Sequence, residues 1–272
     1  MMEIYADLIK FNIGFIGCGN MGGALIGGLL NTACAPSDIT VFYTNTEKTA
    51  ELKKLGICVA ESAAEAEEKS DLIIFAVKPN VIDIVLSQMN GFSDKIYLSI
   101  AAGVSVAHLE EMLGADKKIV RAMPNTPAQV GCGMTVISPN NNMNGEDIKK
   151  VKMVLSAVGA VEELPERFMS IATALHGSSP AYVYMMIDAM ADAGVEFGLT
   201  KAAALKLAAN AVKGSAEMVL STGVHPEQLK DNVCSPGGTT IAAVCDLEDN
   251  KFRATVQSAV RACVKKADDM SK

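Results

Sequence analysis

Two glycine-rich turns, one near each end of the 272-residue chain, have the residue types of an anion site. The first, "GCGNMG" at 17–22, follows an apolar run and precedes a helical pattern. The second, "SPGGTT" at 235–240, also leads into an apolar helical pattern. Backbone N–H groups at the start of a helix can bind a phosphate or a carboxylate. A capped helix with a flexible entry is the alternative for the second turn.

The first turn has the spacing of a dinucleotide-binding loop. Gly17 permits the tight turn, Gly19 lets a pyrophosphate approach the backbone, and Gly22 lets helix and strand pack closely. The strand before and the helix after give this short motif its meaning, although a purely structural turn is the alternative. The predicted cofactor contacts in this segment are Ile16, Gly17, Cys18, Gly19, Asn20 and Met21.

The residues that distinguish NAD from NADP are expected at the end of the run "ITVFY" (39–43). In NAD enzymes an acidic residue at this position binds the ribose 2′-hydroxyl. Here the run continues into Thr44, Asn45 and Thr46, and the first acid is Glu47. Hydroxyls and an amide can bind a 2′-phosphate, whereas a carboxylate would repel it. The segment favours NADPH, with NADH as the alternative. No arginine follows, Lys48 can point away, and the same three residues also suit an ordinary turn or helix cap.

Two further runs end in residues suited to the cofactor crevice, which lies at the carboxyl ends of parallel strands. The run ending in "FAVKPN" contributes Ala76, Val77, Lys78 and Pro79. The run ending in "SIAAGVS" contributes Ala101, Ala102 and Gly103, which are small enough to let a flat ring lie against the backbone. Lys78 taken alone is equally consistent with a solvated surface lysine.

The elements that position these turns follow from hydrophobic periodicity. Between Phe11 and about Pro165, short β-branched runs alternate with helical patterns, which indicates βαβ units in a parallel sheet with helices on both faces. After Pro165, Ala, Met and Leu recur at helical spacing. We therefore predict an α/β fold, with a Rossmann-type doubly wound sheet in residues 1–165 and an all-helical domain in residues 166–272.

Composition narrows the class of partner to a small molecule. The 24 Lys+Arg and 31 Asp+Glu give a charge of −7 with no long run of one sign, which argues against nucleic acid or a membrane surface. Seven scattered cysteines without a C-x-x-C pair argue against disulfides or zinc and suggest reduced thiols in the cytoplasm. The start "MMEIYADLIKF" resembles neither a signal peptide nor a transit peptide.

Other titratable residues are interpreted as structural. His108, His176 and His225 are far apart and lack metal-ligand spacing, so no metal site is predicted. Asp188, Asp192 and Glu196 share one helix face, for which a solvated face or an interface is favoured over a cation site. The same acids interrupt the most apolar segment and argue against a membrane span.

From about Phe11 to Arg261, the chain resembles the pyrroline-5-carboxylate reductases. The most specific segment is "PEQLKDNVCSPGGTTIAAVCDLE", and "FIGCGNMGGAL", "AVKP", "AAGVS", "RAMPNTPAQVGCGMT" and "SSPAYVYMMIDAMADAGVEFGL" agree in the same order. The resemblance implies NAD(P)H-dependent reduction of a cyclic imine to L-proline. It also implies that residues 1–165 bind NADP, that residues 166–272 bind substrate and dimerise, and that dimers often assemble further, as a decamer of five dimers.

The resemblance also assigns roles around the second turn. Ser235 and the backbone amides around Gly237, Gly238 and Thr239 hold the substrate carboxylate. The Thr240 hydroxyl, the catalytic group, approaches the imine nitrogen, and Asn232 reaches the cofactor from the partner subunit. A protonated C=N bond is already electrophilic, so the reaction mainly requires alignment. Thr240 can orient the imine or help to supply its proton from water.

Three departures from the family pattern leave contacts open. His176-Gly177-Ser178-Ser179-Pro180 stands where many relatives have Ser-Gly-Ser-Gly-Pro, Gly223 stands where some relatives have a glutamate, and Ala63 stands where an asparagine often contacts the cofactor ribose. Two other classes remain as alternatives. One is an NADP-dependent reductase acting on a β-hydroxy acid or a deazaflavin cofactor, and the other is a nucleotide sensor without catalysis.

Overall fold

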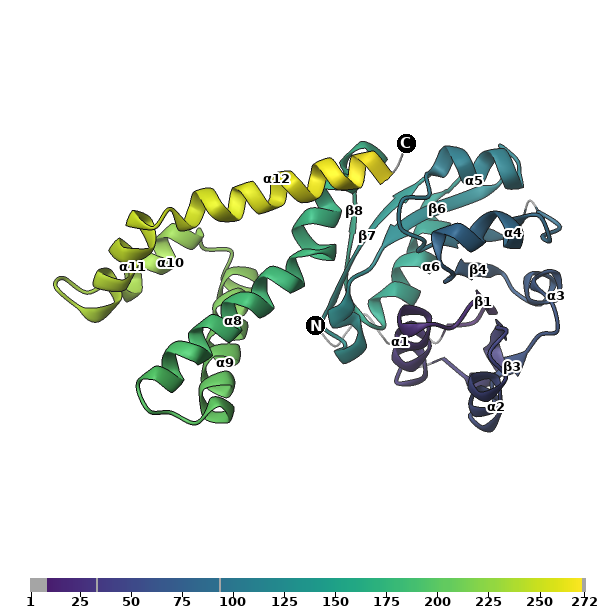
Figure 1. Ribbon diagram of the computed structural model, residues 1–272. Helices are drawn as coiled ribbons and strands as arrows, with labels where there is room; N and C mark the ends of the chain where they lie inside the picture. The colour runs from purple at the N-terminus through teal and green to yellow at the C-terminus, as the bar shows by residue number, and fades with distance from the viewer. Residues whose placement is uncertain (1–8, 33, 93, 271–272) are drawn as a thin grey trace. The chain divides into compact units, whose positions relative to one another are not determined.

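A computed structural model describes residues 9–270 except 33 and 93 (Figure 1). The first eight residues, on which the exclusion of a signal peptide partly rests, lie outside this range. The chain divides into two compact units. The sheet unit runs to Gly177 and resumes at Val264, and the helical unit is Ser178–Cys263.

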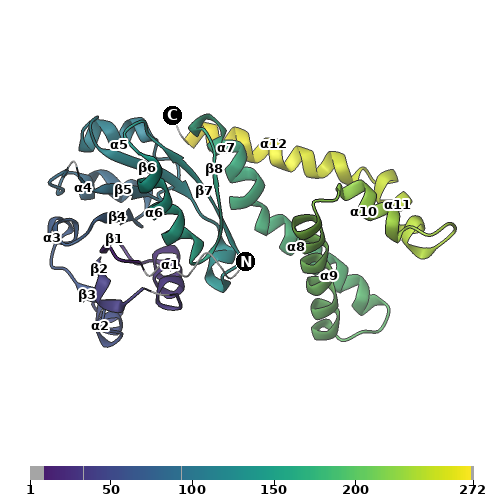
Figure 2. The same cartoon turned by 180° about the vertical axis from the view of Figure 1, so that it is seen from behind.

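The sheet unit contains one eight-stranded sheet in the order β3-β2-β1-β4-β5-β6-β7-β8, seen from both sides in Figures 1 and 2. The strands are β1 (Ile13–Ile16), β2 (Ile39–Phe42), β3 (Cys58–Val59), β4 (Leu72–Phe75), β5 (Ile96–Ser99), β6 (Lys118–Met123), β7 (Gly133–Pro139) and β8 (Gly159–Glu163). The order reverses direction at β1, because the chain builds outward to β2 and β3 and then returns to place β4 on the other side of β1. This reversal creates a crevice at the carboxyl ends of β1 and β4.

Helices cover both faces of the sheet, as predicted for a doubly wound fold. They are α1 (Asn20–Leu30), α2 (Thr46–Lys54), α3 (Ala63–Glu68), α4 (Ile82–Leu86), α5 (Val106–Leu113), α6 (Gly145–Ser156) and α7 (Met169–Ala172), with short turns η2 (Pro36–Asp38), η3 (Pro79–Val81), η4 (Thr126–Val130), η5 (Glu166–Phe168) and η6 (Thr173–Gly177). Side chains alternate along each strand. Leu72 and Ile74 therefore enter the core under α1 and α6, whereas Ile73 and Phe75 enter the core under α3, α4 and α5.

Two details of the sheet differ from the sequence prediction. Strand β7 pairs with β6 in the antiparallel direction, although a parallel sheet was expected. Only residues 124–132 separate these strands, which is too short for a helical crossover but sufficient for a reversal. Strand β3 was not predicted, because two residues carry no periodic signal.

The helical unit contains α8 (Ser179–Glu196), α9 (Lys201–Thr222), α10 (Pro226–Val233), α11 (Thr239–Asp249) and most of α12 (Phe252–Met270). Helices α8 and α9 pack as a hairpin, where Gly194 lies so close to Ala204 that an added Cβ would be 2.9 Å from the Ala204 Cβ. Lys201 Nζ at the start of α9 contacts Asp188 Oδ1 at 2.6 Å and Asp192 Oδ1 at 2.5 Å. These two acids therefore form an ion pair with a lysine.

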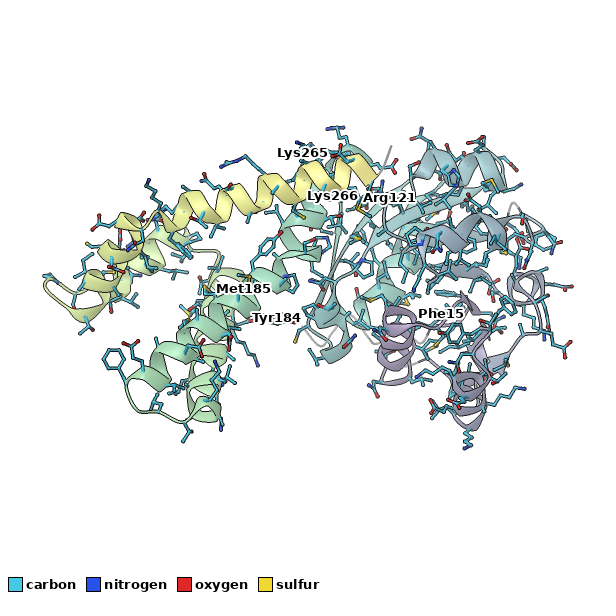
Figure 3. The ribbon with its side chains drawn as sticks, in the orientation of Figure 1. Phe15, Arg121, Tyr184, Met185, Lys265 and Lys266 are labelled. Carbon is cyan, nitrogen blue, oxygen red and sulfur yellow. The ribbon has the colours of Figure 1, made fainter. Side chains whose placement is uncertain are left out.

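The helical unit buries little of its own apolar surface. Within the described residues, its buried apolar side chains are Ala191, Ala204 and Ala208. Tyr184 and Met185 on α8 are 57% and 73% exposed, whereas Phe15 in the sheet unit is fully buried (Figure 3). A helical unit with so small a core is typical of a chain that buries this surface against a partner. Among the described helices, none is long and apolar enough to cross a membrane.

Candidate active site

The first glycine turn lies at the crevice between the ends of β1 and β4. The Gly17 N–H donates to Phe42 O at 2.8 Å, and the Ala76 N–H donates to Ile16 O at 2.9 Å. These bonds hold the turn between the ends of β2 and β4. Helix α1 then begins with Gly19 as its N-cap, and no side chain caps it. Its first N–H groups are thus available to an anion.

The three motif glycines have the three environments that a dinucleotide requires. Gly17 has φ +94°, and a Cβ there would lie 2.6 Å from Ala76 O. A Cβ on Gly22 would lie 3.1 Å from the Ala76 Cβ, which explains the close packing of α1 on β4. A Cβ on Gly19 would meet nothing within 4 Å. The first and third glycines therefore allow tight packing, and the middle one leaves open space for a phosphate beside the backbone.

Two cavities lie on either side of Gly19 and Tyr43. The first cavity, of about 280 Å³, lies over the strand ends and is lined by Ile16, Gly17, Gly19, Phe42, Tyr43, Thr44, Ala76, Val77, Lys78, Val81 and Val85. The second cavity, of about 470 Å³, lies over the helix starts and is lined by Cys18, Gly19, Asn20, Gly23, Tyr43, Asn45, Lys48 and Gln129. The first suits a flat apolar base, and the second suits phosphate groups.

The segment after β2 is partly committed to capping α2. The Asn45 side chain accepts a hydrogen bond from the Lys48 N–H at 2.9 Å, which makes it the N-cap. The cap uses the Asn45 side-chain oxygen and not its amide nitrogen. The contact of Asn45 with a 2′-phosphate therefore remains a prediction. Thr46 lines neither cavity, and Ala63 is buried at the first position of α3.

Ala101, Ala102 and Gly103 line a separate small cavity of about 70 Å³ in the sheet unit, together with Arg121. Arg121, labelled in Figure 3, donates to Glu166 Oε1 at 2.9 Å, and its side chain is 12% exposed. The same carboxylate oxygen accepts the Val106 N–H at 2.9 Å. This link fixes the start of α5 beside the strand end that carries the three small residues.

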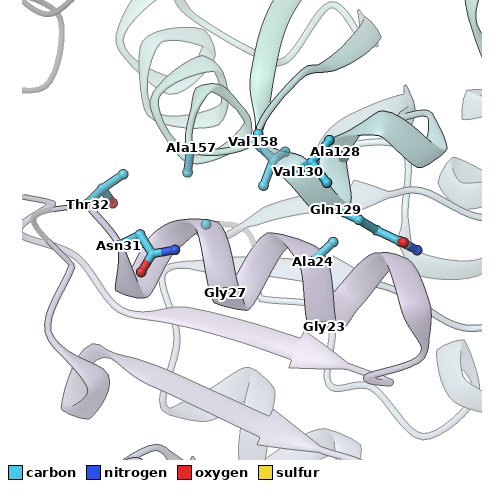
Figure 4. Close-up of a pocket in the computed structure, with 12 residues that line it drawn as sticks. Gly23, Ala24, Gly27, Asn31, Thr32, Ala128, Gln129, Val130, Ala157 and Val158 are labelled. Atoms are coloured by element: carbon cyan, nitrogen blue, oxygen red, sulfur yellow. The ribbon is translucent and has the colours of Figure 1, made fainter. Parts of the chain in front are cut away.

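A groove of about 680 Å³ continues from the second cavity along α1. Its lining residues are Gly23, Ala24, Gly27, Gly28, Asn31, Thr32, Ala128, Gln129, Val130, Gly131, Ala157 and Val158. Figure 4 shows the small residues of α1 facing the segments around Ala128 and Ala157. Gly23 and Gln129 are shared with the second cavity, so the two hollows adjoin.

The thiol of Cys18 lies under the first turn and is 2% exposed. Burial raises its pKa, and the positive charge of Lys48 partly opposes this effect. The thiol is therefore protonated near neutral pH and leaves the anion site without a competing negative charge. Lys48 and Cys18 line the same cavity.

The second glycine turn joins α10 to α11 and is largely exposed in the single chain. Gly237 has φ +67°, a conformation that favours glycine. The Gly238 N–H donates to Ser235 O at 3.0 Å, and a Cβ on Gly238 would collide with Ser235 Oγ. Helix α11 begins at Thr239 with Gly238 as an N-cap that has no side-chain bond. The N–H groups of the first helical turn are therefore available to a carboxylate.

Ion pairs between the surrounding helices hold the second turn in place. Arg253 of α12 contacts Glu227 of α10 at 2.8 Å and Glu248 of α11 at 2.6 Å. His225 is the N-cap of α10, and its Nδ1 accepts the Glu227 N–H at 3.2 Å. Gly223 ends α9 with φ +65°, a conformation in which a glutamate would be strained.

The other two histidines, His108 and His176, belong to the sheet unit. His108 Nε2 lies 2.6 Å from Asp83 Oδ1, which links α5 to α4. Both ring nitrogens of His176 are buried and have no hydrogen-bond partner among the described residues. Burial lowers the pKa of His176, so it is uncharged at neutral pH. Within the described residues, no group of His, Cys, Asp and Glu could hold a metal ion.

Most of the predicted cofactor residues line the first or the second cavity, and the others do not. Met21 packs on the core, Pro79 begins η3, and Asn232 belongs to the helical unit, where it accepts from Gln228 Nε2 at 3.0 Å. Sequence reasoning missed Tyr43, Gln129 and the inward position of Lys48. Tyr43 directly follows β2, so its position at the strand end was a usable signal.

Comparisons with known proteins agree along the whole chain. Residues 166–270 match the family model "Pyrroline-5-carboxylate reductase dimerisation", and residues 12–103 match "NADP oxidoreductase coenzyme F420-dependent". Pyrroline-5-carboxylate reductase from Escherichia coli (strain K12) is 48% identical over 96% of this chain and 98% of its own. The enzyme from Synechocystis is 41% identical over 97% of this chain and 100% of its own.

Solved structures give the same result. The Plasmodium falciparum pyrroline carboxylate reductase, solved with NADP bound, superposes with a TM-score of 0.87 at 36% identity and covers 98% of this chain and 100% of its own. The Coxiella burnetii enzyme superposes with a TM-score of 0.91 at 33% identity and covers 97% and 99% of the two chains. The predicted fold class, a Rossmann-type sheet followed by a helical dimerisation region, is confirmed. The chain belongs to the pyrroline-5-carboxylate reductase family, whose members are NAD(P)H-dependent oxidoreductases that act on a cyclic imine.

Proposed function

We propose that this chain reduces the C=N bond of 1-pyrroline-5-carboxylate with NADPH and forms L-proline, the last step of proline biosynthesis. The observation that carries the proposal is the second turn, in which two glycines precede a helix start without a side-chain cap. A protein that only senses a nucleotide needs no such carboxylate site. Relatives that share this whole chain are named for the same reaction.

The first turn and the strand ends are proposed to hold NADPH, with NADH as the alternative. The proposed contacts are Ile16, Gly17, Cys18, Gly19, Asn20, Met21, Thr44, Asn45, Thr46, Ala76, Val77, Lys78, Pro79, Ala101, Ala102 and Gly103. The bound nicotinamide supplies the hydride. The open space at Gly19 and the uncapped start of α1 support this assignment.

The second turn is proposed to bind the substrate carboxylate through Ser235 and the backbone amides of Gly237, Gly238 and Thr239. The Thr240 hydroxyl then orients the imine nitrogen or passes it a proton from water. Asn232 is proposed to reach the cofactor held by the partner subunit. Since a protonated imine is electrophilic, alignment of the two reacting carbons is the main contribution of the protein.

The assembly is proposed to be a homodimer that forms a decamer of five dimers. The exposed apolar side chains of the helical unit support burial against a second copy. Residues 1–165 are proposed to bind NADP, and residues 166–272 are proposed to bind substrate and dimerise. A cytoplasmic location is part of the proposal, supported by seven cysteines that form no disulfide.

The test is an assay of the purified protein with the imine and each reduced cofactor. We expect imine-dependent oxidation of NADPH with proline as the product, and a higher kcat/KM with NADPH than with NADH. Folded protein that binds NADPH but forms no proline would contradict the proposed reaction. A higher kcat/KM with NADH would contradict only the cofactor preference.

A further inference from the structure

Lys48 lies where sequence reasoning did not place it. It is the third residue of α2, directly after the segment that follows β2. Its side chain is 44% exposed, and it lines the second cavity together with Gly19, Asn20 and Asn45. The neighbouring Glu47 is exposed and lines neither cavity. The helix therefore turns the lysine toward the nucleotide turn and the acid away from it.

The charge of Lys48 is free to be used by a ligand. Its Nζ is 3.7 Å from Glu51 Oε2, a long surface pair that contributes little to stability. The same charge opposes the rise in the pKa of the Cys18 thiol, which lies beneath the first turn. The ion pair of Lys48 is thus the long one with Glu51, and the lysine also lines the second cavity.

The position of Lys48 distinguishes two phosphate sites. The pyrophosphate of a dinucleotide binds at the start of the first helix, here at Gly19 and Asn20. The 2′ position of the adenosine ribose lies at the end of the second strand, where NADP enzymes place a cation. Lys48 belongs to the segment after β2, so it is on the 2′ side of the second cavity.

We propose that Lys48 is the specificity-determining residue that binds the 2′-phosphate of NADPH, while the Asn45 side chain mainly caps α2. This inference rests on the proposed use of NADPH. It assigns the preference for NADPH over NADH mainly to one lysine and not to the polar residues 44–46. Lys48 touches the cofactor away from the reacting carbons, so its effect is expected in binding and not in hydride transfer.

The test measures binding of two probes that differ only by the 2′-phosphate, 2′,5′-ADP and 5′-AMP, by titration calorimetry. In Lys48→Gln we expect the affinity for 2′,5′-ADP to fall about tenfold, a loss typical of one charged contact. The affinity for 5′-AMP should change less than about twofold. Lys54→Gln is the matched control, because it removes the same charge from the last turn of α2 and lines neither cavity.

Three results would overturn the inference. Equal weakening of both probes would place Lys48 on the 5′-phosphate side, and unchanged binding would make it a solvated lysine. Loss of preference in Lys78→Gln, with preference retained in Lys48→Gln, would assign the 2′-phosphate to the first cavity. The imine assay of the wild-type protein with NADPH and NADH tests the proposed reaction independently of these measurements.

Discussion

Both turns contain glycines and lead into a helix, but their surroundings are opposite. Gly17 is buried between Phe42 and Ala76, and the sheet beneath it contains large apolar side chains with no exposed surface. The turn around Gly237 is exposed and is held by ion pairs between three helices. The first turn is therefore complete within one chain. The second has a defined backbone but lacks surrounding surface, as expected of a region that functions in an oligomer.

The comparison shows that the two turns contain glycine for different physical reasons. In the first turn, Gly17 and Gly22 are required by neighbouring backbone and side chains, whereas Gly19 has open space beside it, which is proposed to hold a phosphate. In the second turn, Gly237 is required by its own φ, and Gly238 is required by Ser235 of the same loop. Substitutions of these glycines can therefore separate a loss of ligand binding from a loss of folding.

The largest effect is expected from Gly19→Val. Its φ of −71° suits any residue, and an added Cβ there meets no protein atom within 4 Å. The fold should be retained, while the valine occupies the space proposed for phosphate. We expect the affinity for NADPH to fall at least about a hundredfold. Thermal denaturation should give an unchanged Tm.

Gly27→Val is the control, because this glycine of α1 is also open but lines only the adjoining groove. It should bind NADPH like the wild type. If Gly19→Val bound NADPH normally, the first turn would not be the phosphate site, and the contrast between the turns would be lost.

A smaller effect is expected from Gly238→Val in the second turn. The added Cβ meets Ser235 within the loop, so the amides proposed to bind the carboxylate must shift. We expect KM for the imine to rise on the order of tenfold, with the Kd for NADPH nearly unchanged. Gly214→Val on α9, where the added Cβ meets nothing within 4 Å, is the control for the helical unit. Equal losses of both ligands would show that the turns do not act separately.

Thr240→Ala tests whether the second turn only binds or also takes part in chemistry. Loss of one orienting hydrogen bond of about 0.5–1.5 kcal/mol would lower kcat several-fold. Loss of proton delivery would cost about a hundredfold or more. We expect the smaller loss, mainly in kcat, with recovery in Thr240→Ser. Thr239→Ala keeps the proposed amide contact and should remain near wild type, and wild-type kinetics in Thr240→Ala would make the turn a structural cap.

The smallest effect concerns His176, just before the helical unit begins. Burial holds its pKa below the ordinary 6.5, so the unfolded chain binds a proton at acidic pH before the folded chain does. Stability is thus retained above about pH 6.5 and falls as the pH drops through that value, by at most about 1.4 kcal/mol per pH unit for one group. Between pH 7.5 and 5.5, wild type should lose more Tm than His176→Ser. Identical losses would show that the buried ring is protonated without cost.

The local sequence determined the parts of this protein that depend on periodicity and glycine spacing. Short apolar runs that alternate with helical patterns predicted the strands and helices. The strands of a sheet that is buried on both faces are continuously apolar. The motif 17–22 predicted a tight turn at Gly17 and close packing at Gly22, and both are present. The resemblance to the reductase family, carried by ordered segments in both halves, is confirmed by full-length relatives.

Only the tertiary structure decided which side chains share a space. The direction of β7 depends on the length of one connection, and the ion pair of Lys201 with Asp188 and Asp192 depends on the α8–α9 hairpin. Lys48 and Asn45 are three residues apart, and the sequence could not show that both line the same cavity while Asn45 also caps a helix. Local patterns encode backbone conformation, whereas the orientation of a side chain toward a cavity depends on elements that are distant in sequence.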